Sequence, residues 1–475
     1  VNSVKIFNAA DMKRGFRVAQ LNCNDDKKYR KSKKRKNLKI KVLSGLLAAM
    51  VCASGVWYAF YRNGWEFELP WAAERKYALL DSGITNEATG IQVKYSTVGK
   101  TDNKNEDSAL ESKDVSDVEL PYAAEYFSSF LTEEEQTVCR QLYKGFREFQ
   151  TDIDITDGVI ESEDICSFIV LCTSCAPEFS YIGQEYSVTL DSSGYVMSVE
   201  VSYTMTAEEA AAQQAEIDAR AEELIAGMGS DWDDYEKFRY IHDNLILSCQ
   251  YKENEGSCYT AYGCLVEGEA VCEGYAKAML TLCEKVGIGC VPVVGSGYEN
   301  GEPLPHIWNK VLLDGEWYCT DPTWDDPVSQ MGEDYIRYDY FAITDKQMNL
   351  DHTADENKYL HYPAAQSVED DFYRRSGAFI ESADDAENII LNAVCTAMAG
   401  NGDYARVKCA DENVYGQTLK TVFEDETESG NPLIFTILKE GSENYPDFGY
   451  SYAGYSIIKN EKDHSLTIKL IRAEN

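Results

Sequence analysis

The 475-residue sequence predicts an α+β protein of several domains behind one N-terminal transmembrane helix. Three observations lead to this prediction. Residues 42–60 carry no charge, helices and hairpin-like strand pairs follow one another from residue 121 onward, and Asp314-Gly315 separates two β-rich runs. A hydrophobic content of 44% and an aromatic content of 12% supply enough apolar side chains for packed cores.

The uncharged run 42–60 is predicted to cross a membrane. As a helix it would span roughly 28 Å at about 1.5 Å per residue, close to a hydrocarbon core of about 30 Å. Residues 1–41 carry a net charge of +11 and the remainder −48, so the N-terminus is expected in the cytoplasm and the rest outside. A cleavable signal peptide is the alternative, because Val51-Cys52-Ala53 offers small residues to a peptidase.

The charge distribution also bears on partners. An acidic body repels phosphates, so no nucleic-acid partner is expected. An outside location permits disulfides among the cysteines, and reduced buried cysteines are the alternative. The predicted organisation is a basic cytoplasmic segment 1–41, a transmembrane helix 42–60, a polar linker 61–120, a small helix-rich α+β domain 121–205, a catalytic domain 206–360 and a C-terminal α+β domain 361–475.

Local signals predict the elements of these domains. Capping boxes that begin at Thr132 and Thr206 each open a helix, and a run of small and polar residues at 191–194 joins two strands. The spacing of apolar residues across Asp231–Leu247 predicts one buried helix face, with His242 beside it in a structural role rather than a catalytic one. In the tail we expect a helix over Ser382–Ala399 and strands over Pro432–Leu438, Gly454–Lys459 and Ser465–Arg472.

Cys272 is predicted to lie in the first turn of a helix that ends at Gly287. Backbone N–H groups and the positive end of the helix dipole favour a thiolate there, and they could stabilise an oxyanion after attack on a carbonyl. Gly274, two residues on, lacks a side chain and is expected to let a substrate backbone approach. Taken alone, Cys272 has the alternative role of a buried residue on a helix face.

The Asp314-Gly315 pair predicts a two-residue hairpin loop, which sets the register of the flanking strands. In that register Trp308 faces Asp321, and His306 lies two residues from Trp308 on the same face. His306 and Asp321 are then diagonal neighbours, about 7–8 Å apart at the backbone. A register shift of one residue would separate them. Cys272 at a neighbouring helix N-terminus would complete a set of thiol, base and orienting carboxylate.

Two sequence segments carry a family resemblance. AVCEGYAKAMLTLCEKVGI at 270–288 and HIWNKVLLDGEWYCTDPTWDDP at 306–327 resemble the core of the transglutaminase-like superfamily, in particular its bacterial cell-surface members. Asp351-His352 also resembles those proteins, and the motif-level similarity covers about 231–352. The resemblance implies a papain-like transglutaminase core with Cys272 as nucleophile, His306 as general base and acid, and Asp321 as the orienting residue.

The same resemblance implies acyl transfer through a thioester on Cys272, either to water or to an amine. Expected substrates are peptides or proteins outside the cell, including cell-wall peptides. No cofactor and no metal ion are expected. A catalytically silent surface module with the same fold is the main alternative. Aromatic side chains and one glycine are candidates for contacting substrate, with core packing as the alternative for each aromatic: Trp308, Trp317, Trp324, Tyr298 and Gly274.

Two short motifs also have the composition of possible metal sites. The acidic Trp324-Asp325-Asp326 is expected to form a solvated turn, with a calcium site as the alternative. Cys172-Thr173-Ser174-Cys175 has the spacing of a zinc or redox pair but lacks a second pair of ligands, so it predicts no metal site.

Overall fold

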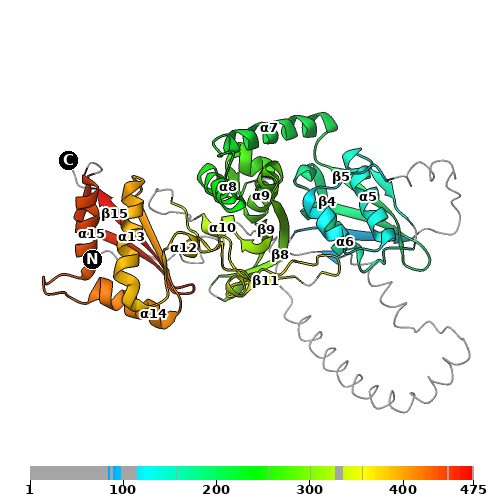
Figure 1. Ribbon diagram of the computed structural model, residues 1–475. Coiled ribbons are helices and arrows are strands. Elements are labelled where there is room, and N and C mark those ends of the chain that lie inside the picture. Colours follow the sequence, from blue (N-terminus) through cyan, green and yellow to red (C-terminus); the bar gives the residue numbers. More distant parts are fainter. Residues whose placement is uncertain are drawn as a thin grey trace, which may run out of the picture. The chain divides into compact units, whose positions relative to one another are not determined.

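The computed structural model describes residues 84–85, 89–97 and 115–472, apart from 157, 255, 300, 327–334, 356 and 447–448. All of these residues belong to one compact unit, Gly83–Asn475. They form a mixture of helices and antiparallel-rich sheets, so the α+β prediction is confirmed (Figure 1). The predicted segments 1–41 and 42–60 lie outside the described residues. Within the described part, every helix is too short or too polar to cross a membrane.

A five-stranded sheet forms the first part of this unit. Its strand order is β1-β2-β4-β5-β3, and β2 pairs with β4 in parallel while the other pairs are antiparallel. The predicted helix at Thr132 is confirmed with its capping box. The elements are β1 (Ile84–Thr85), β2 (Gln92–Thr97), α4 (Tyr122–Ser128), α5 (Glu133–Arg147), β3 (Asp152–Asp154), α6 (Ile165–Ser174), η2 (Pro177–Phe179), β4 (Ile182–Leu190) and β5 (Val196–Tyr203).

Strand β2 lies within the segment that the sequence predicts to be a polar linker. The prediction of a polar spacer over 61–120 is wrong for residues 92–97, which pair with β4 along their whole length. Val93 and Tyr95 are buried and alternate with exposed Lys94 and Ser96, so one face of this short segment supplies apolar area to the sheet. The polar residues that suggested a spacer form its other face.

A four-stranded antiparallel sheet of order β10-β9-β8-β11 forms the second part. The capping boxes at Thr206 and at Asp233 open its first two helices. The elements are α7 (Ala207–Ile225), α8 (Asp234–Ser248), β6 (Gln250–Tyr251), η3 (Ser257–Tyr259), η4 (Gly263–Glu267), β7 (Glu269–Ala270), α9 (Cys272–Val286), β8 (Gly289–Glu299), β9 (Glu302–Leu313), β10 (Glu316–Thr320), α10 (Pro322–Asp325), α11 (Asp345–Met348) and β11 (His352–Ala354).

The hairpin register predicted from the sequence is confirmed. Asp314 and Gly315 form the loop with φ angles of 48° and 92°, and Glu316 pairs with Leu313. Pairing continues to Thr320, opposite Asn309. Both loop residues therefore adopt the positive φ that a tight hairpin turn of this hand requires. Beyond Thr320 the chain leaves the ladder and turns into α10.

Helix α9 packs against strands β8 and β9 and brings Cys272 to the sheet. Its apolar face is buried, and Gly287 ends the helix with a φ of 77°, as the sequence predicts. Asn309 on β9 donates a hydrogen bond to the carbonyl of Ala276 at 3.2 Å, which ties the first half of the helix to the strand. The position of the helix N-terminus relative to the hairpin is thereby set.

A third sheet, of order β12-β13-β15-β14, closes the described chain. Helices α13 and α15 pack against each other and against this sheet (Figure 1). The elements are α12 (Phe372–Arg375), β12 (Phe379–Ile380), η5 (Ala383–Asp385), α13 (Ala386–Ala399), β13 (Tyr404–Cys409), α14 (Glu412–Thr418), η6 (Leu419–Glu424), α15 (Leu433–Asn444), β14 (Tyr450–Asn460) and β15 (Ser465–Arg472).

Helix α15 is a correction, because Pro432–Leu438 was predicted to be a strand. The β-branched and aromatic residues of this short run favour a strand when read alone. The buried residues are Ile434, Ile437, Leu438 and Gly441, a spacing that matches one face of a helix. Packing of that face against α13 decides between the two conformations.

Candidate active site

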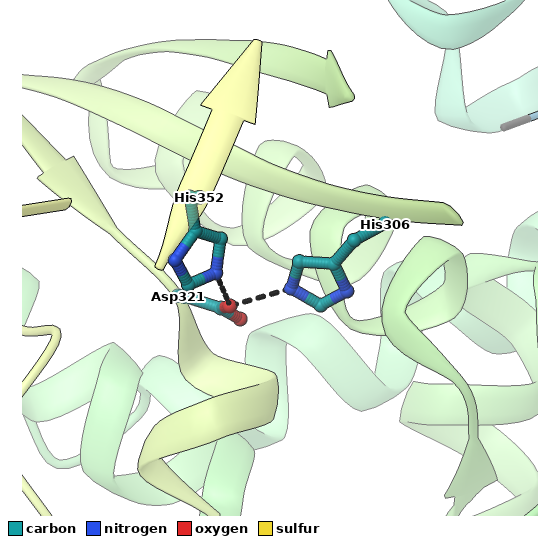
Figure 2. Close-up of side chains that lie close together, drawn as sticks. All are labelled: His306, Asp321 and His352. Atoms are coloured by element: carbon teal, nitrogen blue, oxygen red, sulfur yellow. Dashed lines mark hydrogen bonds and ion pairs between the residues drawn. The ribbon is translucent and has the colours of Figure 1, made fainter. Parts of the chain in front are cut away.

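The second sheet brings His306 and Asp321 into contact. Nε2 of His306, on β9, lies 2.6 Å from Oδ2 of Asp321, and the two side chains are 7% and 0% exposed. Asp321 is the N-cap of α10, and its Oδ1 accepts hydrogen bonds from the backbone N–H groups of Thr323 and Trp324. Both oxygens of the carboxylate therefore accept hydrogen bonds. Figure 2 shows the bonds to Oδ2, the oxygen that faces the rings.

The electrostatics of this pair favour an ionised carboxylate and a protonated ring. Burial lowers the pKa of His306, but the charge of Asp321 and its hydrogen bond, followed by Cys272, raise that pKa to about 10. Burial raises the pKa of Asp321, but the two imidazole rings beside it hold the pKa well below its usual range. At neutral pH the pair is an imidazolium and a carboxylate.

Cys272 is the first residue of α9 and is half-buried, whereas most of the described cysteines are buried. Val271, the N-cap, makes no side-chain hydrogen bond to the first turn, so the backbone N–H groups there are left without a side-chain cap. Cys272 contributes to the raised pKa of His306, so the thiol lies close to this ring. Nε2 of the ring is bound to Asp321, which leaves the Nδ1 edge for Cys272.

A second imidazole shares the same carboxylate. Nε2 of His352, at the start of β11, lies 3.1 Å from Oδ2 of Asp321, and its Nδ1 lies 2.8 Å from Oδ1 of Asp351 (Figure 2). The ring is 1% exposed. From the sequence, Asp351-His352 is part of a family resemblance only, and no role at the site is predicted for His352.

The structure separates the predicted substrate-contacting aromatics. Trp324 is half-buried, with its ring centroid 5.6 Å from that of His306. Trp308 is 2% exposed and packs in the core with Val293 and Met348. Trp317 lies four residues before Asp321, roughly 13 Å along the strand, and packs on Tyr126 of α4. Trp308 and Trp324 both lie beside the imidazole rings, but Trp308 is buried, so Trp324 is the indole there with an exposed portion.

The two remaining substrate candidates also have clear positions. A Cβ on Gly297 would point at Trp324 and His306, so strand alternation places Tyr298 on the opposite face of β8. A Cβ on Gly274 would lie 2.4 Å from the carbonyl oxygen of Cys258. The space beside Gly274 is therefore filled by the protein's own backbone, and this close approach explains the glycine.

A buried polar cluster underlies α10. His242 is completely buried, with its ring nitrogens 3.1 Å from Asp243 and 3.2 Å from Asp325. The predicted structural role of His242 is confirmed by these contacts. Burial lowers its pKa, but hydrogen bonds to the two carboxylates raise it to about 9, whereas burial raises the pKa of Asp325 to about 7.

The same cluster corrects the reading of Trp324-Asp325-Asp326 as a solvated turn. Asp325 is fully buried and accepts from His242 and from the backbone of Tyr340, and Asp326 binds the hydroxyl of Tyr275. The sequence predicts a surface turn here because the buried partners of these acidic residues lie far away in the chain.

Tyr251 is a further neighbour of Cys272, and the sequence does not predict it. Its pKa is raised by burial and then by the nearby Cys272 thiol. The parallel pairing of β6 with β7 places Tyr251 opposite Ala270, two residues before Cys272. A pairing between two strands of two residues each leaves no periodic signal in the sequence.

The three side chains in Figure 2 are also the one group in the described chain whose geometry could hold a metal ion. Their candidate ligand atoms lie within 4.8 Å of one another. These atoms already hydrogen-bond each other, with Oδ2 of Asp321 accepting from both rings. Each polar atom at the centre of the group thus has a partner within the protein.

Fold and site together define a class of protein. An α+β domain presents a cysteine at a helix N-terminus, close to an imidazole on an adjoining strand that a buried carboxylate holds in place. This is the arrangement of thiol, base and orienting acid that recurs in cysteine-dependent enzymes.

Residues 219–322 match the family model of the transglutaminase-like superfamily. Its members are usually cysteine-dependent enzymes. The match includes Cys272, His306 and Asp321, and ends at Pro322, the first residue of α10. No curated protein matches the chain.

Three solved structures were also compared. A candidate cysteine protease from Cytophaga hutchinsonii is 18% identical, over 23% of this chain and 37% of its own, with a TM-score of 0.20. A TGase is 16% identical over 30% and 46%, with a TM-score of 0.22. Menin, described with its binding site for Mixed Lineage Leukemia (MLL) protein, is 11% identical over 70% and 64%, with a TM-score of 0.20. The chain spans less than two thirds of each, and scores this low carry no argument.

Proposed function

We propose that this protein is a cysteine-dependent acyl-transfer enzyme, with Cys272 as nucleophile, His306 as general base and acid, and Asp321 as the residue that orients His306. The observation that carries the proposal is the 2.6 Å hydrogen bond between the His306 ring and the buried Asp321 carboxylate, with the Cys272 thiol at a helix N-terminus close to the same ring. The half-buried position of Cys272 supports it, because a nucleophile must be reached by its substrate.

The chemistry follows from the charges of these groups. The Cys272 thiolate attacks the carbonyl carbon of a carboxamide or peptide, and backbone N–H groups of the first turn of α9 stabilise the oxyanion. The C–N bond breaks as the thioester forms, and His306 gives its proton to the leaving amine. Water or a second amine, deprotonated by His306, then attacks the thioester and releases the acyl group. Side chains and backbone suffice for each step.

Substrate and location are part of the same proposal. Peptides or proteins at the cell surface, including cell-wall peptides, are the proposed substrates, and residues 42–60 are proposed to anchor the enzyme with its domains outside the membrane. Trp324 is the proposed substrate-contacting aromatic, because it is half-buried beside His306.

The direct test is a thiol probe followed by mass spectrometry of the full chain. We expect selective alkylation at Cys272 that is lost in His306→Ala. Cys395 is the matched control, since it is the other half-buried cysteine of the described chain and lies on α13, outside the superfamily match. Cys395→Ser should leave the labelling of Cys272 unchanged.

A second experiment separates the reaction types. The full chain is incubated with candidate surface peptides, with and without an added amine, and the adduct on Cys272 is identified by mass. A thioester that is consumed faster with amine indicates transamidation, and one that is consumed equally indicates hydrolysis. If Cys272 reacts no faster than Cys395 and forms no thioester, the enzyme proposal is refuted and a silent surface module takes its place.

A further inference from the structure

His352 binds the Asp321 carboxylate, but the proposed mechanism gives it no role. Asp321 accepts four hydrogen bonds, two on Oδ1 from backbone N–H groups and two on Oδ2 from imidazole rings. The ring of His352 supplies one of the latter, on the same oxygen that His306 binds (Figure 2). Its centroid is 4.4 Å from that of Trp324 and 5.0 Å from that of Trp308, so the ring has little freedom to move.

The protonation state of His352 follows from its two partners. Nε2 faces Asp321 and Nδ1 faces Asp351, and an ionised carboxylate only accepts hydrogen bonds. Both ring nitrogens therefore carry hydrogen, and His352 is a buried cation. Burial lowers its pKa and the charge of His306 lowers it further, but the hydrogen bonds to the two carboxylates outweigh both effects.

Asp351 supplies a second negative charge to this group. Two imidazolium rings on one carboxylate would compete for it, but Asp351 balances the charge of His352. The charge of Asp321 acts on both rings, and Asp351 supplies the second charge that offsets the two imidazolium rings. His352 thus restrains the carboxylate with a hydrogen bond, while Asp351 shares in holding its proton.

The network continues into the C-terminal sheet. Oδ2 of Asp351 accepts from the hydroxyl of Tyr340 at 2.8 Å and from Nζ of Lys462 at 3.2 Å. Lys462 lies in the turn between β14 and β15. Asn460 and Ser465, which flank that turn, each bind the buried carboxylate of Asp339 at 2.9 Å. The turn is therefore attached at two points to the segment that carries His352.

We propose that His352 is a positioning residue for the site, and that the β14–β15 turn strengthens its hold on Asp321 through Lys462 and Asp351. The inference rests on the proposed function, since it concerns how the carboxylate behind His306 is kept in place. The proposal gives the C-terminal sheet a role at this site. The superfamily match does not include that sheet, because the match ends at residue 322.

The test compares two substitutions of His352 in the full chain. His352→Leu removes both N–H donors, whereas His352→Gln keeps an amide N–H that can reach Asp321. We expect His352→Leu to slow alkylation of Cys272 by about tenfold, the scale of one lost hydrogen bond to a charged group, and His352→Gln to recover most of that loss. NMR of histidine ring carbons should show the His306 titration displaced in His352→Leu and restored in His352→Gln.

Lys462→Met tests the contribution of the turn with little risk to folding, because the lysine side chain is 56% exposed. We expect alkylation to slow by about threefold, as an exposed ion pair allows. Lys462→Arg should recover the rate. Lys459→Met, at an exposed lysine three residues earlier on β14, is the matched control and should match the wild type.

The outcomes separate the two proposals. A wild-type Cys272 that reacts no faster than Cys395 refutes the proposed function, and the His306 titration still tests the positioning role. A reactive Cys272 whose rate and His306 titration are unchanged in His352→Leu overturns the positioning role. If His352→Leu does not fold, Lys462→Met becomes the test. The positioning role is then overturned when Lys462→Met and the wild type have equal alkylation rates and the same His306 titration.

Discussion

Asp321→Asn is the substitution that best isolates the electrostatic part of the site. The asparagine keeps a carbonyl oxygen that can accept from the N–H groups of Thr323 and Trp324, now 3.0 and 3.3 Å from Oδ1, so α10 remains capped. The negative charge 2.6 Å from Nε2 of His306 is lost. The substitution therefore changes the charge at the ring with little change in the local backbone.

The expected magnitude follows from the raised pKa of His306, which is about 10 compared with an ordinary value of 6.5. A neighbouring opposite charge typically accounts for 1–3 pKa units, and we expect a fall of about 2 units, equivalent to about 2.7 kcal/mol. Because the folded-state pKa is raised, the protonated ring contributes stability that is complete below pH 6.5 and is lost as the pH rises through about 10. The stability difference between wild type and variant should shrink over that window.

The assay is NMR of histidine ring carbons in the full chain, which contains only five histidines. Wild-type His306 should titrate near pH 10 and the variant about 2 units lower. Asp325→Asn is the matched control, because Asp325 lies on the same short helix but binds His242. It should lower the titration of His242 from about 9 and leave His306 in place. A His306 titration that moves by less than half a unit in Asp321→Asn would refute the charge argument.

Three further predictions can be checked with the same protein. Gly297→Ala should slow alkylation of Cys272 by about tenfold, because the new Cβ would lie 2.9 Å from Cζ2 of Trp324. Mass spectrometry measures the rate, and an unchanged rate would mean that Trp324 moves freely. Thr206→Ala should lower the free energy of unfolding by about 1 kcal/mol through loss of a capping box, with no change in alkylation beyond experimental error, and denaturant titration checks this. Dialysis against a chelator should leave the alkylation rate unchanged, because Asp321 already accepts a hydrogen bond from each ring, whereas a loss of rate restored by zinc would indicate a metal-dependent site.

The sequence predicts those features that depend on neighbours along the chain. The Asp314-Gly315 loop favours one hairpin geometry over the others, and strand alternation then determines which residues share a face. The capping boxes at Thr132 and Thr206 likewise satisfy backbone groups within a single turn. The helix that begins at Cys272 is recognised in the same way, from its own periodicity and its terminal glycine.

Tertiary packing decides the features for which the local sequence allows two outcomes. The residues of α15 fit a strand or a helix, and burial against α13 selects the helix. Asp325 has the sequence context of a surface turn, and His242, 83 residues away, makes it a buried partner. Trp308 and Trp324 both lie near His306 in the sequence and beside the rings in space, but packing buries the first and leaves the second partly exposed.

Sequence alone determined the Cys272 helix, the hairpin and the register that joins His306 to Asp321, because each depends on contacts between residues close together in the chain. The tertiary structure alone decided that His352 shares the same carboxylate. That contact depends on the pairing of β11 with β8, where His352 lies opposite Gly297. Pairing over so long a loop is determined by the packing of the whole sheet, and it leaves no periodic signal in the intervening residues.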